Sequence, residues 1–195
     1  MKLKKFLEEH NIEAMLISSK YSLRYFTGFT GTTGIALAFA EKRFFFTDFR
    51  YVTQAKKEVE PNGFTVVKVE RGAVDALAEY IKNSGIKKLG IEDKYVTLAE
   101  YVVYKEKFEG IGFVTLGEAL DKLRMIKTEE EIGYIKKAVE IGDKVFEYIL
   151  DKVKEGAVEK DLAAEMEFQM KKLGGEGPSF ETIIASNYRS ALPHG

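Results

Sequence analysis

The sequence predicts an α/β domain followed by a second, mainly helical domain. Over roughly the first 120 residues, short apolar runs typical of strands alternate with stretches typical of helices, which favours a sheet covered by helices. Beyond that point, long stretches with the spacing of helical apolar faces replace this alternation. We therefore expect two domains, at residues 1–122 and 123–195.

The composition is typical of a soluble globular protein and excludes several other classes. Hydrophobic residues make up 45% of the 195 residues and charged residues 31%, with a formal net charge of −1. Nucleic-acid binding normally requires a basic face, and no segment provides one. No apolar run approaches the roughly 20 residues that span a bilayer. The absence of cysteine excludes disulfides and thiolate metal sites.

The N-terminal sequence and the residue usage predict the cellular location and the source of the protein. The stretch from Met1 to His10 predicts an amphipathic helix and is too polar and acidic for a signal peptide. Asn and Gln are scarce while Lys and Glu are abundant, a bias typical of thermophilic proteins. We expect a cytoplasmic protein from a thermophilic source.

Five apolar or β-branched runs of the first domain predict strands. They are Ala14–Ile17, Gly34–Phe39, Phe44–Thr47, Thr65–Val69 and Lys88–Ile91. Only three polar residues separate the second run from the third, which predicts an antiparallel pair joined by a short turn.

Three helices are predicted among these strands, at Tyr51–Val59, Ala73–Lys82 and Leu98–Lys107. Residues typical of helix ends follow the first two, namely Pro-Asn-Gly at residues 61–63 and Asn-Ser-Gly at residues 83–85. The order of strands and helices again favours a sheet covered by helices.

The second domain is predicted to contain two helices and one strand. Thr128 and Glu131 have the spacing of a capping box, and the apolar residues that follow keep helical spacing for more than 20 residues. Gly156 ends this helix. A second apolar stripe ends at the pair of glycines at residues 174–175, which suits a left-handed cap. The β-prone run Phe180–Ala185 predicts a strand.

The chain has two histidines, and their surroundings differ. His10 ends the first predicted helix, where it is either a cation that favours the helix dipole or an exposed side chain. His194 follows the predicted strand and lies between Pro193 and Gly195, one rigid and one flexible residue. From the residues alone, His194 is either a catalytic group or a solvated side chain of a loop.

Other polar patterns favour structural roles. The glycines of residues 27–34 lack the spacing of a phosphate-binding loop and precede a strand, so they predict turns. Asp48 and Arg50 could orient a ligand, but capping of the next helix and local pairing are favoured. The three glutamates of residues 129–131 lie in the first turn of a helix and favour its dipole. No His-Glu-x-x-His zinc motif is present.

Four parts of the sequence, taken in order, resemble a known family. Ser22–Gly31 and Thr47–Ala55 are similar to the Tyr-Leu-Thr-Gly-Phe and Thr-Asp-x-Arg-Tyr-x-x-Gln-Ala stretches of the creatinase-type N-terminal domain. Leu123–Ile132 resembles the Leu-Arg-x-Ile-Lys-Ser/Thr-x-x-Glu-Ile entry to the pita-bread catalytic domain. Glu176–Ile183 and Arg189–Gly195 resemble the segment leading to its first active-site histidine. The family is that of metal-dependent Xaa-Pro peptidases, the aminopeptidase P and prolidase type.

The resemblance implies both a fold and a reaction. The fold is a creatinase-type, ribonuclease H-like α/β domain with a mixed sheet, followed by an incomplete α+β pita-bread domain. Family members cleave the bond between an N-terminal residue and proline, using two divalent ions (Mn, Co or Zn) that activate water. The histidine matching His194 contacts the substrate and helps to move a proton, without binding metal. Asn187 replaces a common Gly but tolerates similar backbone geometry.

The resemblance also implies that the metal centre lies elsewhere. The family's ligands, two Asp, one His and two Glu, all follow this histidine, and the sequence ends one residue after His194. We expect these residues to be the N-terminal part of a longer enzyme, inactive alone and without a metal of their own. Expected partners are peptides with proline second and another copy in a homodimer, with no nucleic acid and no membrane. The alternative is a non-catalytic peptide-binding or dimerisation module of the same fold.

Overall fold

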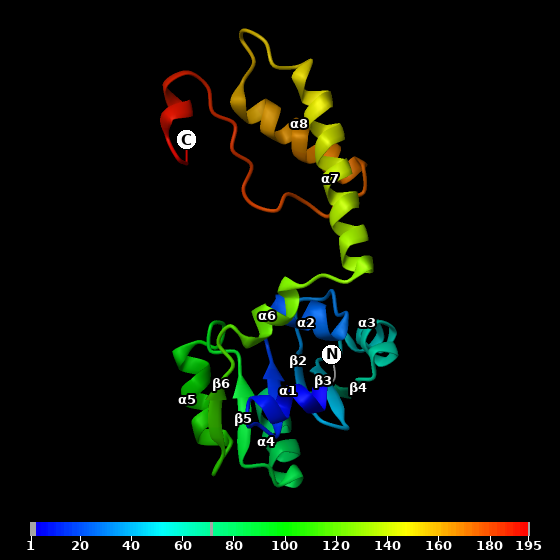
Figure 1. The fold of residues 1–195 in the computed structure, drawn as a ribbon, viewed down its shortest axis with the longest axis vertical. Helices are drawn as coiled ribbons and strands as arrows, with labels where there is room; N and C mark the ends of the chain where they lie inside the picture. Colours follow the sequence, from blue (N-terminus) through cyan, green and yellow to red (C-terminus); the bar gives the residue numbers. More distant parts are fainter. Residues whose placement is uncertain (1–2, 71, 195) are drawn as a thin grey trace. The chain divides into compact units, whose positions relative to one another are not determined.

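The computed structural model describes residues 3–70 and 72–194, and the chain divides into two compact units. The N-terminal unit extends to Met125, and the C-terminal unit begins at Ile126. Figure 1 shows the first unit in blue to green and the second in yellow-green to red. Within the described residues, no helix is both long enough and apolar enough to cross a membrane.

A six-stranded mixed sheet forms the centre of the N-terminal unit. The strands are β1 (Ala14–Ile17), β2 (Ile35–Phe39), β3 (Arg43–Thr47), β4 (Thr65–Lys68), β5 (Lys88–Ile91) and β6 (Gly112–Thr115). Their spatial order is β4-β3-β2-β1-β5-β6. Strand β2 is antiparallel to β1 and β3, and all other neighbours are parallel. The mixed sheet and the antiparallel pair of β2 and β3 confirm the sequence predictions.

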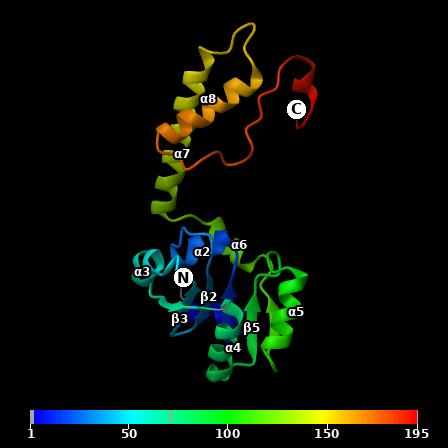
Figure 2. The same cartoon turned by 180° about the vertical axis from the view of Figure 1, so that it is seen from behind.

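Helices cover both faces of this sheet (Figures 1 and 2). One face carries α1 (Leu3–Glu9), α2 (Lys20–Thr27), α3 (Val52–Val59, continued by the 3-10 turn Glu60–Asn62) and α6 (Ala119–Met125), and the other carries α4 (Ala73–Ser84) and α5 (Leu98–Lys107). Because side chains alternate along a strand, Met15 and Ile17 of β1 point into the first layer and Ala14 and Leu16 into the second. Strand β1 is therefore buried on both faces.

Three elements of the N-terminal unit, α2, β6 and α6, were not predicted from the sequence. Helix α2 begins where the Ser19 hydroxyl accepts a hydrogen bond from the Ser22 N–H (3.1 Å), and it ends at Gly28, whose φ is 78°. Strand β6 begins with a glycine and contains only two apolar residues, Phe113 and Val114, and α6 has only seven residues, too few for a clear helical period.

A buried carboxylate joins the end of β5 to the start of α2. Glu92 is 4% exposed and accepts hydrogen bonds from the backbone N–H groups of Ser18 (2.7 Å) and Ser19 (2.9 Å). The Ser19 hydroxyl donates a third bond (3.0 Å). A charge taken out of water is costly unless it is fully hydrogen-bonded. The hydrogen bonds of Glu92 therefore hold the end of β5 against the start of α2.

The C-terminal unit contains α7 (Glu129–Leu150), α8 (Glu159–Lys172) and the 3-10 turn η2 (Asn187–Ala191). The predicted capping box starts α7: Thr128 Oγ1 accepts from the Glu131 N–H (3.2 Å), and the Glu131 carboxylate accepts from the Thr128 N–H (2.7 Å). Just beyond α8, Gly174 has a φ of 96°, which confirms the expected left-handed cap.

The strand predicted at Phe180–Ala185 is wrong. These residues have no regular secondary structure, and residues 126–194 contain no strand. A strand needs a neighbour to pair with its backbone N–H and C=O groups, so β propensity alone does not form one. Side-chain contacts with α8 hold this segment instead.

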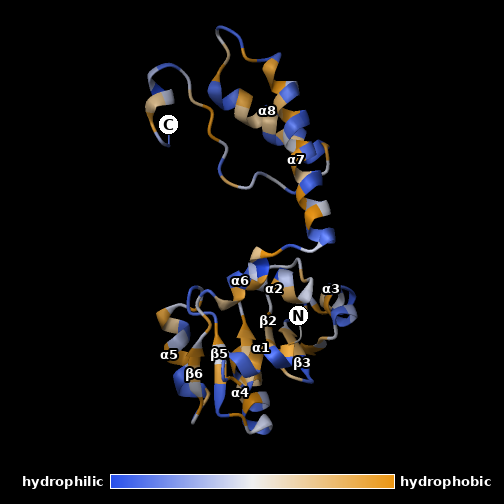
Figure 3. Ribbon diagram, in the orientation of Figure 1, coloured by the Kyte–Doolittle hydropathy of each residue, from blue (hydrophilic) through white to orange (hydrophobic). Residues whose placement is uncertain are grey.

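Hydrophobic residues recur along α7 and α8 (Figure 3), yet few apolar side chains of the C-terminal unit are buried. Among residues 126–194, the buried ones are Val145 and Ile149. Phe146, Phe168 and Phe180 remain 59%, 59% and 77% exposed. Exposed aromatic side chains of this size are common where another segment or molecule covers the surface.

Replacing Glu92 with Gln is expected to lower the free energy of unfolding of the N-terminal unit by about 2–3 kcal/mol, because charge-assisted hydrogen bonds are lost and a buried amide faces N–H donors. Urea unfolding followed by circular dichroism measures this change. Glu41→Gln, at an exposed position between β2 and β3, is the matched control and should shift stability by less than about 0.5 kcal/mol. Equal loss in both variants would contradict the anchoring role of Glu92.

Amide hydrogen exchange of the 195-residue chain is expected to be slow in the sheet and fast in α7 and α8, because protection follows buried apolar contacts. Mass spectrometry of peptic peptides measures this difference. Equal protection of the two units would show that the C-terminal unit is stabilised by something other than apolar burial.

Candidate functional site

The one catalytic residue expected from the sequence, His194, is exposed in the turn that follows η2. It lies at the end of a long segment without strands or α-helices, residues 174–194. The position of His194 therefore depends on how this segment is attached to the helices of its unit.

Two contacts attach the segment to α8. Thr182 Oγ1 donates to Glu167 Oε1 (2.9 Å), and the Ser186 N–H and hydroxyl both donate to Glu159 Oε1 (2.6 and 2.7 Å). The two anchors are four residues apart in the segment, about 13 Å when extended, and eight residues apart in α8, a rise of about 12 Å. Because these lengths agree, the segment runs extended and antiparallel along α8.

Glu159 is the most heavily bonded group of this attachment. Besides the two bonds from Ser186, its carboxylate forms an ion pair with Arg189 Nε (3.0 Å). The hydrogen bonds from Ser186 and then the charge of Arg189 hold the pKa of Glu159 below its ordinary value of 4.5. Glu159 is also the first residue of α8, where the helix dipole favours negative charge.

Helix α8 is in turn bonded to α7. The Tyr148 hydroxyl donates to Glu165 Oε1 (2.6 Å), and Gln169 Nε2 donates to the same oxygen (3.2 Å). These bonds, the one from Tyr148 first, lower the pKa of Glu165. The Lys152 ammonium lies 4.9 Å from the centre of the Tyr148 ring. Helix α8 thus offers a supported surface for the segment that carries His194.

The residues described do not form the two-metal centre that the resemblance implies. Across residues 3–70 and 72–194, no three His, Asp or Glu side chains are grouped so that they could hold an ion. On α8, the carboxylates of Glu159, Glu165 and Glu167 accept hydrogen bonds from neighbouring side chains instead.

The remaining sequence candidates have structural roles. His10 Nδ1 lies 2.9 Å from the Phe6 carbonyl oxygen, and the centroids of the His10 and Phe6 rings are 4.2 Å apart. His10 thus lies at the end of α1, as expected. Arg50 pairs with Asp48 through two hydrogen bonds (2.7 and 3.0 Å), confirming local pairing and lowering the pKa of Asp48. Capping of α3 by either side chain is wrong: the N-cap residue is Tyr51, which makes no capping hydrogen bond, and the Asp48 carboxylate accepts from the Arg50 N–H (2.9 Å), which lies before the helix. The Asp48 carboxylate is already occupied by Arg50.

The glycines of residues 27–34 form turns, as predicted. Gly28 ends α2, and a Cβ atom at Gly31 or Gly34 would collide with the rings of Phe29 or Phe45. These glycines therefore allow close packing of the loop on the sheet. The glutamates of residues 129–131 occupy the first turn of α7, also as predicted.

Glu159 was missed by sequence reasoning. Its partner Ser186 is 27 residues away, so no local spacing links the two. The only local signal was its place in the first turn of a predicted helix, which by itself indicates a dipole effect.

Known proteins resemble this chain along its whole length. A profile of the Creatinase/Prolidase N-terminal domain matches residues 1–126, and one of Metallopeptidase family M24 matches residues 133–195. The Xaa-Pro dipeptidase of Pyrococcus furiosus is 37% identical, and the peptidase YqhT of Bacillus subtilis is 39% identical, each over 100% of this chain and 54% of the relative. The solved Xaa-Pro dipeptidase of Bacillus anthracis has a TM-score of 0.92 at 39% identity, with 100% of this chain and 54% of the other covered. The chain thus spans about half the length of these relatives.

The bond between Ser186 and Glu159 is expected to weaken in acid. Because the folded-state pKa of Glu159 is lowered, the contact contributes stability above about pH 4.5, and this contribution is lost as the pH falls through the lowered pKa. The NMR shift of the Ser186 amide, followed from about pH 7 to about pH 3, measures this titration. A Ser186 amide shift that stays constant over this range would contradict the contact, and Glu159→Gln should remove the titration.

Proposed function

The chain belongs to the Creatinase/Prolidase N-terminal domain family, and on this premise we propose that it is the N-terminal part of a metal-dependent Xaa-Pro peptidase. The complete enzyme would hydrolyse the bond between an N-terminal residue and a following proline. The observation that carries this proposal is the pair of family matches in order, the Creatinase/Prolidase domain and then family M24. The 39% identity with an Xaa-Pro dipeptidase of known structure supports it.

In this proposal, His194 contacts the substrate and moves a proton. Its exposure supports this role because a peptide can reach the ring, and histidine is the side chain that most often acts as a general acid or base. The two divalent ions, Mn, Co or Zn, would be held by residues outside these 195 and would supply an activated water.

The proposal extends to the organisation of the protein. Residues 1–122 would be the N-terminal domain and residues 123–195 the beginning of the peptidase domain, in keeping with the two family matches. A cytoplasmic location, a homodimer, a thermophilic source and the choice of ion stay predictions of this proposal.

The complete protein encoded with this chain, loaded with Mn, Co or Zn, is expected to cleave Xaa-Pro dipeptides or Xaa-Pro-Xaa tripeptides and to leave peptides with Ala in place of Pro intact. His194→Ala should lower kcat/KM by about 10²- to 10⁴-fold, the usual contribution of a positioned acid or base. His10→Ala is the matched control and should keep full activity. Release of the N-terminal residue, measured by chromatography, tests these expectations.

The other outcomes each remove one part of the proposal. Absence of cleavage with all three metals would favour a non-catalytic peptide-binding or dimerisation module. Cleavage that His194→Ala leaves unchanged would keep the reaction but remove the role assigned to His194.

A further inference from the structure

We propose that Glu159 is a positioning residue, which holds the segment carrying His194 in place through Ser186 and Arg189. This inference rests on the proposed function of His194 and names a residue that acts through it. It begins from the three contacts of 2.6, 2.7 and 3.0 Å that converge on the Glu159 carboxylate.

The contacts of Glu159 hold both the entrance and the middle of the 3-10 turn η2. Ser186 is the N-cap residue of η2, and Arg189 lies within it. Inside the turn, the Arg189 N–H donates to the Ser186 carbonyl (3.0 Å), and the Ser190 hydroxyl donates to the Asn187 carbonyl (2.6 Å). The turn is thus bonded internally and anchored externally by one side chain.

A short and stiff path leads from η2 to His194. The Leu192 N–H donates to the Arg189 carbonyl (2.9 Å), and Pro193 restricts its own φ and the conformation of Leu192. A fixed turn followed by a restricted dipeptide transmits the position of the anchor to the imidazole.

The backbone at the anchor gives a further reason for a strong contact. Asn187 has a φ of 49°, in the left-handed region that costs most residues energy and that Asn tolerates better than others. Asn187 is the first residue of η2 and directly follows Ser186, whose N–H donates to Glu159. Holding Ser186 therefore holds the residue at which η2 begins.

The effect of losing the Glu159 anchor can be estimated from the number of residues between His194 and the nearest anchored residue. With Arg189 held, His194 lies five residues from a fixed point; without Glu159, the next anchor is Thr182, twelve residues away. In the limiting case in which these residues behave as a flexible chain, five residues reach about 12 Å and twelve about 20 Å. The local concentration of the imidazole at a fixed point falls about fourfold, as the inverse 3/2 power of length, before any loss of orientation.

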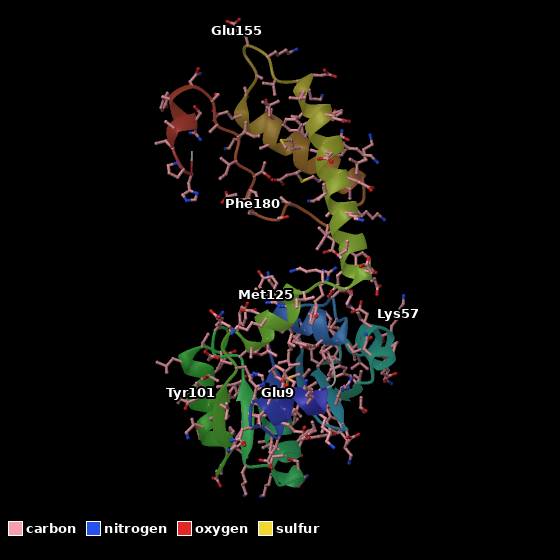
Figure 4. The ribbon with its side chains drawn as sticks, viewed as in Figure 1. Glu9, Lys57, Tyr101, Met125, Glu155 and Phe180 are labelled. Carbon is pink, nitrogen blue, oxygen red and sulfur yellow. The ribbon has the colours of Figure 1, made fainter. Side chains whose placement is uncertain are left out.

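The test compares Glu159→Gln with Glu155→Gln in the complete protein encoded with this chain. Glu155 is an exposed carboxylate in the loop before α8, so its variant has the same charge change away from the segment (Figure 4). Hydrogen exchange of residues 186–192 should rise about tenfold in Glu159→Gln, because loss of a charge-assisted hydrogen bond exposes the amides. Exchange in Glu155→Gln should match the wild type.

The kinetic readout separates positioning from general damage. Glu159→Gln should lower kcat/KM on an Xaa-Pro peptide between about 4-fold, the tether estimate, and about 100-fold, the cost of a misplaced group. In a His194→Ala background, the same substitution should change kcat/KM by less than about twofold, because a group that acts through His194 has nothing left to position. An undiminished loss in that background would overturn the proposal.

Separate outcomes distinguish this proposal from the proposed function. Absence of peptidase activity in the wild type removes the proposed function, while the exchange comparison still decides whether Glu159 anchors the segment. Equal exchange in Glu159→Gln and Glu155→Gln overturns the anchor whatever the activity. Arg189→Gln, which leaves α8 intact, is the second variant if Glu159→Gln fails to fold, and it should raise exchange of residues 186–192 in the same direction.

Discussion

A carboxylate that accepts backbone N–H groups from a distant segment is the interaction on which each unit depends. Glu13 accepts from two consecutive N–H groups at the start of β5, Glu58 from Thr30, Glu92 from the start of α2, and Glu159 from Ser186. An ionised carboxylate has several acceptor sites and no donor, so it can satisfy adjacent N–H groups that no secondary structure reaches. Each contact fixes a loop at the end of a regular element.

The two units differ in how much buried apolar surface accompanies these carboxylate contacts. In the N-terminal unit, apolar layers on both faces of the sheet supply the stability, and Glu92 selects how β5 and α2 meet. In the C-terminal unit, Val145 and Ile149 are the buried apolar side chains among residues 126–194. Contacts such as that of Glu159 therefore carry a larger share of the order in the segment leading to His194.

The sequence predicts elements that have a long periodic pattern or a partner that follows closely in the chain. Helix α7 shows its apolar period over 22 residues and its start at Thr128, and β2 and β3 follow one another across a short turn. Strand β6 begins with a glycine and has only two apolar residues, and α2 buries one apolar residue, Leu23, so neither shows the apolar run or stripe of the predicted elements. The strand expected at Phe180–Ala185 failed because β propensity needs a partner strand. Among candidate site residues, His194 follows from resemblance, whereas its anchor depends on contacts 27 residues apart.

The placement of Glu159 connects the electrostatics of α8 with the position of the segment that follows this helix. At the first residue of the helix, the N-terminal dipole, the donors of Ser186 and the charge of Arg189 all favour the ionised carboxylate. Their combined effect keeps the carboxylate ionised, and the anchor formed, at neutral pH. The ionised carboxylate at the first residue of α8 thus holds a segment whose anchored residue, Ser186, lies 27 positions further along the chain.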